Sequence, residues 1–115
     1  MKELDLLIEK IKKFRDERDW AKYHNPKDIA ISIAIEAGEL LENFQWKDND
    51  EALSQKKQEI IDEMADVFIY LLLLSDSLSV DIIDAAIKKV DKNSAKYPVS
   101  KVYGDYKKYT EIEVS

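Results

Sequence analysis

Two pairs of acidic residues have a spacing that could bind a metal ion. Glu36 and Glu39 form an E-x-x-E pair, and Glu63 and Asp66 form an E-x-x-D pair. Side chains three residues apart lie on the same face of a helix. Glu36 also falls on the apolar stripe that contains Ile29. Because burying an ionised carboxylate without a partner costs several kcal/mol or more, these pairs predict a cationic partner.

The segment 36–66 contains too few basic residues to supply that partner. It holds ten acidic residues against three lysines, a local net charge of −7. Only oxygen ligands are present, so a hard divalent cation, Mg²⁺ or alternatively Mn²⁺, is expected. A di-iron site is disfavoured because it needs Glu-x-x-His motifs, and the single histidine, His24, lies outside both pairs. The alternative is that both pairs are solvated faces of charged helices.

Aromatic and basic side chains occur near the expected ends of the helices. Trp20, Tyr23 and His24 cluster at one turn, Trp46 follows the next helix, and Tyr70 comes one turn after Asp66. Such rings could form a stacking slot for a planar base, or they could cap the core. A further helix carries a polar stripe suited to phosphate oxygens, although its lysines also favour the helix dipole: Lys89, Asn93 and Lys96.

Four amphipathic helices are expected to position these residues. Two glycines and two prolines are too few to punctuate a multistranded sheet, and apolar residues recur at three- and four-residue steps. Asn25 before Pro26, and Asp81, are expected to cap two of the helices. The fold class is therefore all-α, a four-helix bundle, with expected helices at about 2–19, 26–44, 51–78 and 81–97.

The composition limits the classes of function. A length of 115 residues indicates one domain, 1–115, of which 98–115 is a C-terminal tail. The net charge of −6 opposes binding to a nucleic acid polymer. The chain has no cysteine, and its longest apolar run, Val67 to Leu74, is far short of the roughly 20 residues that span a bilayer. No membrane partner and a cytoplasmic location are expected.

The chain resembles the MazG-like family of all-α nucleoside triphosphate pyrophosphohydrolases, and within it the dCTP pyrophosphatase branch. The resemblance covers nearly the whole chain, and the segments that carry it include 14–20, 23–24, 36–40, 44–47, 63–70, 91–93, 96–99 and 108–111.

This resemblance implies a Mg²⁺-dependent hydrolysis of nucleoside or deoxynucleoside triphosphates, dCTP-like ones preferred, to the monophosphate and pyrophosphate. It implies a house-cleaning role and a homo-oligomer with its site between subunits, a tetramer built from dimers being favoured over a dimer. The metal ligands and catalytic residues would be Glu36, Glu39, Glu63 and Asp66. The substrate contacts would be Trp20, Lys22, Tyr23, His24, Trp46, Tyr70, Lys89, Asn93 and Lys96.

The chain departs from this family's pattern at Ile11. Animal relatives carry a histidine near the nucleotide at the matching position, so other deoxynucleoside triphosphates, dATP included, stay open as substrates. Two alternative functions also stay open. One is a non-catalytic helical oligomerisation module, and the other is a module that senses nucleotides without cleaving them.

Overall fold

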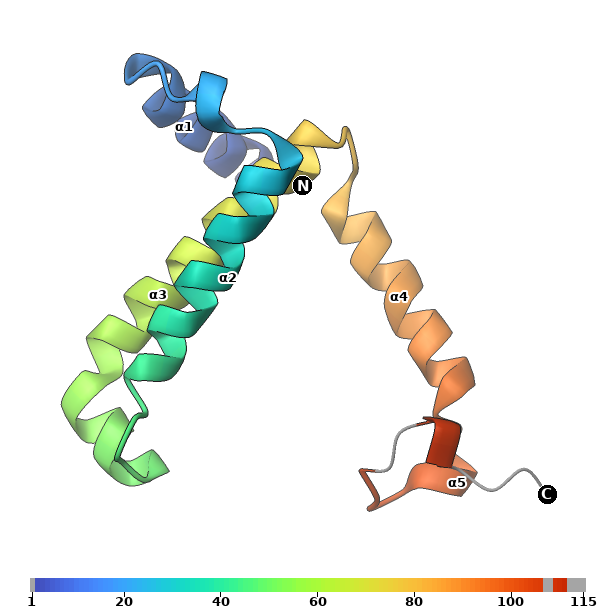
Figure 1. The fold of residues 1–115 in the computed structure, drawn as a ribbon. Helices are drawn as coiled ribbons and strands as arrows, with labels where there is room; N and C mark the ends of the chain where they lie inside the picture. The colour runs from blue at the N-terminus through green and yellow to red at the C-terminus, as the bar shows by residue number, and fades with distance from the viewer. Residues whose placement is uncertain (1, 107–108, 112–115) are drawn as a thin grey trace. The chain divides into compact units, whose positions relative to one another are not determined.

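The computed structural model describes residues 2–106 and 109–111, and its regular elements are all helical (Figure 1). This confirms the all-α class, and the bounds of the four long helices lie within two residues of the expected ones. The elements are α1 (Lys2–Glu17), η1 (Ala21–Tyr23), α2 (Pro26–Glu42), α3 (Asn49–Ser77), α4 (Ile82–Lys96), α5 (Val99–Val102) and η2 (Tyr109–Glu111). The predicted tail contains the short α5 and η2, and its residues 107–108 and 112–115 lie outside the described part.

The chain divides into two compact units, one ending at Val80 and the other beginning at Asp81. The first unit contains α1, η1, α2 and α3, and the second contains α4, α5 and η2. The single-domain organisation over 1–115 stays a prediction.

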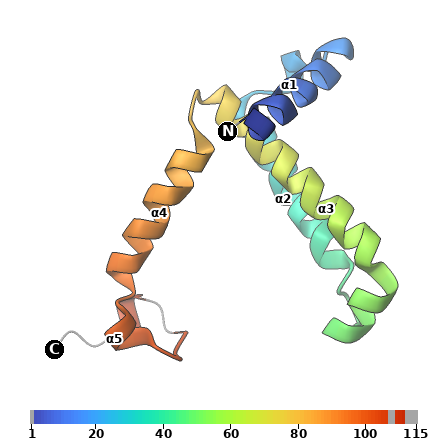
Figure 2. The same cartoon turned by 180° about the vertical axis from the view of Figure 1, so that it is seen from behind.

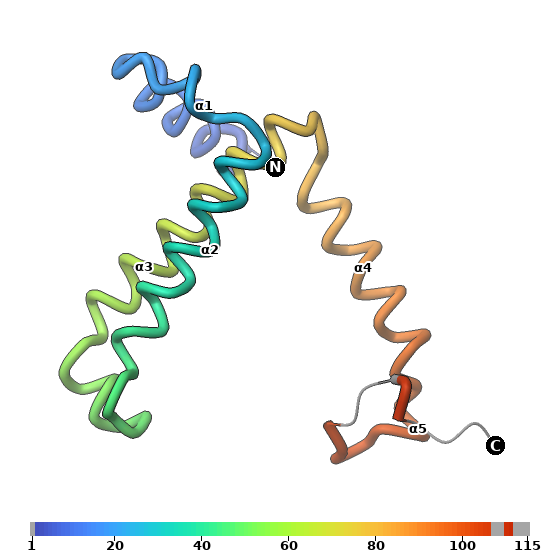
Figure 3. Tube along the Cα trace, in the orientation of Figure 1, coloured from blue at the N-terminus to red at the C-terminus, as the bar shows by residue number. Residues whose placement is uncertain are grey.

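In the first unit, α2 and α3 run side by side in opposite directions, and α1 packs against α3 (Figures 1 and 2). The trace in Figure 3 shows the tight reversal between α2 and α3. Burial of apolar side chains from all three helices holds this unit together. The buried apolar residues are Ile11 from α1, Ile29 from α2, and Ala52, Ile60, Leu72 and Leu73 from α3.

Side-chain caps define where the helices begin. The carboxamide oxygen of Asn25 accepts a hydrogen bond from the backbone N–H of Asp28 at 2.9 Å, and Pro26 occupies the first turn of α2. Asp81 caps α4 in the same way through the N–H of Asp84, at 3.1 Å. Both predicted caps are confirmed, since each satisfies a backbone donor that the helix itself leaves unpaired.

The backbone is irregular at one position in the α2–α3 reversal and at one position inside α3. Trp46 has a φ of +63°, in the left-handed backbone region that residues other than glycine rarely adopt. Lys56 has non-helical angles, φ −127° and ψ 17°, and α3 kinks there. Beyond the kink, α3 packs antiparallel to α2, which brings Glu63 of α3 next to Glu36 and Glu39 of α2.

The second unit is a helix followed by shorter turns. Its α4 is stabilised on the exposed side by an ion pair one turn apart, between Lys88 and Asp84 at 2.8 Å. Lys89, Asn93 and Lys96 lie on this helix at one-turn spacing, as predicted. Across the described residues, no helix combines the length and the apolar character needed to span a membrane.

Candidate functional site

Three carboxylates from two helices converge in the first unit. Glu36 and Glu39 project from α2, and Glu63 projects from α3. One oxygen from each lies within 4.8 Å of the oxygens of the other two, and all three residues are partly buried. The packing of α2 against α3 thus joins one complete predicted pair with the first member of the other.

The carboxylate group is short of positive partners in a way that suits a metal ion. One carboxylate oxygen of Glu36 and one of Glu63 are buried, and neither has a hydrogen-bond partner. An unpaired buried carboxylate oxygen is costly, and a cation removes that cost. Oxygen ligands on opposite sides of one Mg²⁺ or Ca²⁺ ion lie about 4–5 Å apart, so the observed separations fit a single hard cation.

Asp66, the fourth predicted carboxylate, lies beside this group and is more exposed. Its negative charge acts on Glu36, and both residues line the same cleft. The structure therefore assembles three of the four predicted residues and places the fourth next to them.

Burial, together with the neighbouring carboxylates, leaves Glu36 difficult to ionise. Burial raises the pKa of Glu36 from its usual 4.5 to about 7, and the carboxylates of Glu63 and Glu39, followed by the charge of Asp66, contribute to the increase. Without a bound cation, Glu36 is therefore about half protonated near neutral pH. A cation would favour the ionised form, because an opposite charge stabilises a carboxylate.

This shift predicts how the stability of the metal-free protein depends on pH. Between pH 4.5 and about 7, Glu36 keeps its proton in the folded chain but has lost it in the unfolded chain. Glu36 therefore favours folding below pH 4.5, and its contribution is lost as the pH rises through about 7. We expect the free energy of unfolding of Glu36→Gln, measured by urea titration with a metal chelator present, to exceed that of the wild type by about 1–3 kcal/mol at about pH 8. At about pH 4 the two free energies should be equal. Identical pH dependence in the two proteins would contradict the raised pKa.

A cleft of about 620 Å³ opens beside the carboxylates, within the size range of small-molecule sites. It is bounded by α1, by the turn through η1, and by α2 and α3. Its lining combines an apolar floor with a few ionisable groups: Leu7, Lys10, Ile11, Phe14, Arg15, Trp20, His24, Glu36, Asp66, Ile69, Tyr70 and Leu73.

Two aromatic rings and a neutral histidine form part of the cleft wall. The Phe14 and Trp20 rings meet edge to face, with centroids 5.8 Å apart. Burial lowers the pKa of His24, and the charge of Arg15 lowers it further, so the imidazole is neutral at pH 7. The Nδ1 atom of His24 is buried without a hydrogen-bond partner. This wall offers a planar ligand both stacking surfaces and polar contacts.

The structure brings together some of the predicted site residues and not others. Trp20, His24, Glu36, Asp66 and Tyr70 line the cleft, and Glu39 and Glu63 complete the carboxylate group. Three other predicted contacts, Lys22, Tyr23 and Trp46, do not line the cleft. Lys22 pairs with Asp19 at 3.0 Å and lies over the Tyr23 ring. Trp46, which follows α2, is 91% exposed. Lys89, Asn93 and Lys96 belong to the second unit. The roles of all of these residues stay predictions.

The sequence reasoning placed only Ile11 of α1 near the nucleotide, through the family resemblance, and it missed Arg15 and the other α1 residues that line the cleft. Leu7, Ile11 and Phe14 follow a helical apolar period, which predicts a core face. That face in fact lines the cleft, and Arg15, the residue after Phe14, lines the cleft as well. The position of Arg15 directly after this apolar stripe was the sequence feature that could have indicated a cleft there.

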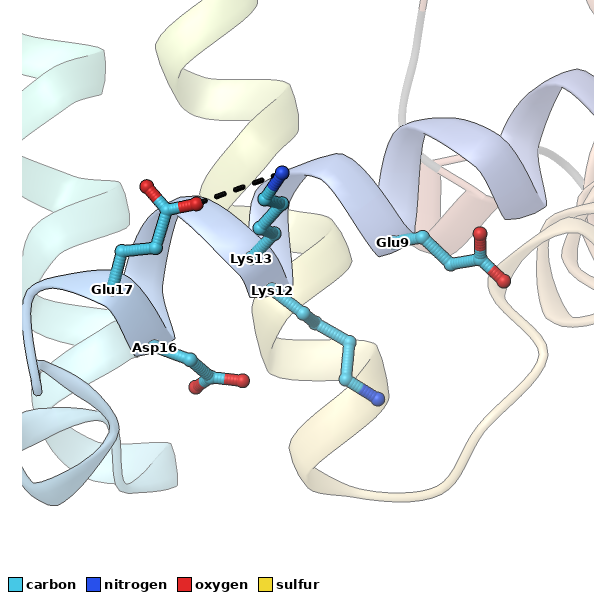
Figure 4. Close-up of a pocket in the computed structure, with 5 residues that line it drawn as sticks. All are labelled: Glu9, Lys12, Lys13, Asp16 and Glu17. Carbon is cyan, nitrogen blue, oxygen red and sulfur yellow. Dashed lines mark ion pairs between the residues drawn. The ribbon is translucent and has the colours of Figure 1, made fainter.

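A second hollow lies along the outer face of α1, and it holds no comparable arrangement (Figure 4). All its lining residues come from this single helix, and Lys13 and Glu17 pair there one turn apart at 3.8 Å. This is the solvated face expected of an amphipathic helix.

The chain is similar in sequence and in fold to known proteins. The family model described as MazG-like matches residues 31–112. Over 104 residues, the chain is 38% identical to mouse dCTP pyrophosphatase 1 and 36% identical to the human protein of the same name. These alignments cover 86% of this chain but only 61% of each relative's length. A crystal structure of a pyrophosphatase from Archaeoglobus fulgidus superposes with a TM-score of 0.79 and 46% identity, covering 84% of this chain and 93% of that one.

Proposed function

Since the chain belongs to the MazG-like family, we propose that it is an enzyme that hydrolyses nucleoside triphosphates, dCTP-like deoxynucleotides preferred, to the monophosphate and pyrophosphate. The observation that carries the proposal is the convergence of Glu36, Glu39 and Glu63 next to a cleft with an aromatic wall. The names of the mouse and human relatives, dCTP pyrophosphatase 1, support the substrate class.

The ion proposed for this site is Mg²⁺, with Mn²⁺ as the alternative, held by Glu36, Glu39 and Glu63 with Asp66 beside them. The two orphaned buried oxygens and the all-oxygen donor set support this assignment. When bound, the ion supplies positive charge that offsets the triphosphate and the charge that develops on the leaving pyrophosphate. An acidic site of this kind would otherwise repel an anionic substrate.

The side chains of the chain itself account for the remaining requirements of the reaction. Hydrolysis adds water to a phosphorus atom, breaks one bridging P–O bond and releases a proton. A carboxylate oxygen of Asp66, exposed beside the three clustered carboxylates, is the proposed proton acceptor. Trp20, His24 and Tyr70 would bind the nucleoside in the cleft. The other proposed contacts are Lys22, Tyr23 and Trp46, and for phosphate or sugar Lys89, Asn93 and Lys96.

We also propose that the chain works as a homo-oligomer, a tetramer built from dimers in preference to a dimer. Large apolar side chains on α2 and α3 are exposed in the isolated chain, which supports a surface that other subunits cover. They include Ile35 at 56%, Leu41 at 70%, Met64 at 57% and Phe68 at 44%. A house-cleaning role in the cytoplasm, removing excess or noncanonical deoxynucleotides, completes the proposal.

A pyrophosphate-release assay tests the activity directly. We expect release from deoxynucleoside triphosphates in the presence of Mg²⁺ and loss of release when a chelator removes the ion, because the carboxylates alone repel the substrate. The substrate panel should include all four deoxynucleotides, the ribonucleotides and 5-modified cytosine nucleotides. No release from any of these substrates would leave a non-catalytic oligomerisation or nucleotide-sensing module as the better assignment.

A further inference from the structure

We propose that Arg15 selects the nucleobase, by donating paired hydrogen bonds to a base edge that presents two adjacent acceptor atoms. This inference rests on the proposed function for its substrate class. It concerns a different part of the cleft from the carboxylates, and it assigns a role to a residue outside the predicted site.

Arg15 lies at the end of the cleft away from the carboxylates. It lines the cleft together with Phe14, Trp20 and His24, and its side chain is only 16% exposed. Its Nη1 atom lies 3.9 Å from a carboxylate oxygen of Asp76 on α3. Asp76 is ten residues beyond Asp66 in the same helix, which is about 15 Å along its axis. A nucleotide with its phosphates at the carboxylates would therefore extend its base toward Arg15 and the aromatic wall.

The charge around Arg15 is already balanced, which argues against a role in binding phosphates. Arg15 pairs with Asp16 at 2.8 Å and with Asp76, and Lys12 also reaches Asp76 at 3.5 Å. These two basic and two acidic groups cancel, so Arg15 itself brings no unbalanced positive charge to a triphosphate, unlike Lys10, the other basic residue in the cleft lining. His24, next to Arg15, is neutral and adds none.

The guanidinium nevertheless retains donors for an uncharged ligand. In the described part of the chain it donates one hydrogen bond, from Nε to Oδ1 of Asp16. The contact with Asp76 is too long for a hydrogen bond, so the N–H groups of both Nη atoms remain able to donate hydrogen bonds to a ligand. The two acidic partners hold the planar fork in position before a ligand arrives, which lowers the entropy lost on binding.

The donor pattern of a guanidinium discriminates among the four bases. A fork of parallel N–H groups matches two adjacent acceptors, such as O2 and N3 of cytosine or O6 and N7 of guanine. Neither adenine nor thymine presents two adjacent acceptors on one edge, so each allows only a single bond to the fork. Arg15 should therefore favour cytosine over thymine among the pyrimidines, and guanine over adenine among the purines.

The test compares the wild type with Arg15→Lys, which keeps the charge beside Asp76 but removes the fork. We expect kcat/KM for dCTP to fall about 10- to 30-fold and that for dTTP to change less than about threefold, so that the preference for cytosine disappears. Lys12→Ala is the matched control, since it also removes a partner of Asp76 but does not line the cleft. It should leave the ratio of dCTP to dTTP activity unchanged. Thermal unfolding of each variant identifies any that fail to fold.

Two results would overturn the inference. A uniform loss for all four deoxynucleotides in Arg15→Lys would indicate a contact to phosphate or sugar, and unchanged base preference would indicate no contact. Calorimetric binding of dCMP and dTMP gives a second readout that needs no turnover, with about tenfold tighter binding of dCMP expected for the wild type only. If the wild type releases no pyrophosphate, the proposed function fails, and monophosphate binding still decides the role of Arg15.

Discussion

Replacing Glu63 with glutamine is expected to reduce pyrophosphate release by about 100- to 1,000-fold while the protein remains folded. Glu63 is the α3 member of the carboxylate group, and one of its oxygens is buried without a partner. An amide keeps the shape of the side chain but removes the negative charge that would hold a divalent cation. The measurement is Mg²⁺-dependent pyrophosphate release at saturating dCTP, with thermal unfolding in parallel.

The control for this substitution lies one turn earlier on the same helix. Glu59 is exposed and lies outside the carboxylate group, so Glu59→Gln makes the same chemical change without touching the site. We expect this variant to keep the activity of the wild type. Addition of Mg²⁺ should raise the unfolding temperature of the wild type and of Glu59→Gln, but not that of Glu63→Gln, because an ion that binds only the folded state stabilises it by mass action. Full activity in Glu63→Gln would exclude the proposed metal site.

Replacing Trp20 with alanine should lower kcat/KM for dCTP about 100-fold, near the upper end of what stacking of a base on an aromatic side chain contributes. Trp20 forms part of the cleft wall and meets Phe14 edge to face, so its loss both removes a stacking surface and admits water. The ring is 44% exposed, so the cost to folding should be small. Steady-state kinetics on dCTP make the measurement.

Two further variants separate stacking from general disturbance of α1. Trp20→Phe keeps a flat ring and should retain activity within about fivefold of the wild type. Leu6→Ala truncates an exposed apolar side chain of α1 that does not line the cleft, and it should have no effect on kcat/KM. Equal losses in Trp20→Ala and Leu6→Ala would show that the cleft wall has no specific role.

The helices could be predicted because their signals are local. Asn25, Pro26 and Asp81 act on neighbouring backbone groups, and their predicted caps are present in the structure. The kink at Lys56 could not be predicted in this way, since neither proline nor glycine lies next to it. The sequence also showed which apolar residues share a face, but not which of these faces remain exposed.

The carboxylate group was accessible from sequence because spacing along each helix determines which side chains share a face. Glu36 and Glu39 had to project together, and only the antiparallel packing of α2 and α3 was needed to add Glu63. The cleft depends instead on how three segments pack in space. Arg15 lies close to Asp76 although 60 residues separate them in the chain, and no local pattern announces such a contact.

The backbone conformation of Trp46 is unfavourable for a residue with a β-carbon. At φ of +63°, an L-amino acid with a β-carbon costs roughly 1–2 kcal/mol that glycine would not. The ring, 91% exposed, regains none of this through burial in the isolated chain. Stability alone would favour glycine at this position. The proposed contact of Trp46 with the nucleotide would give this conformational cost a reason, as a trade-off between stability and function outside the hydrophobic core.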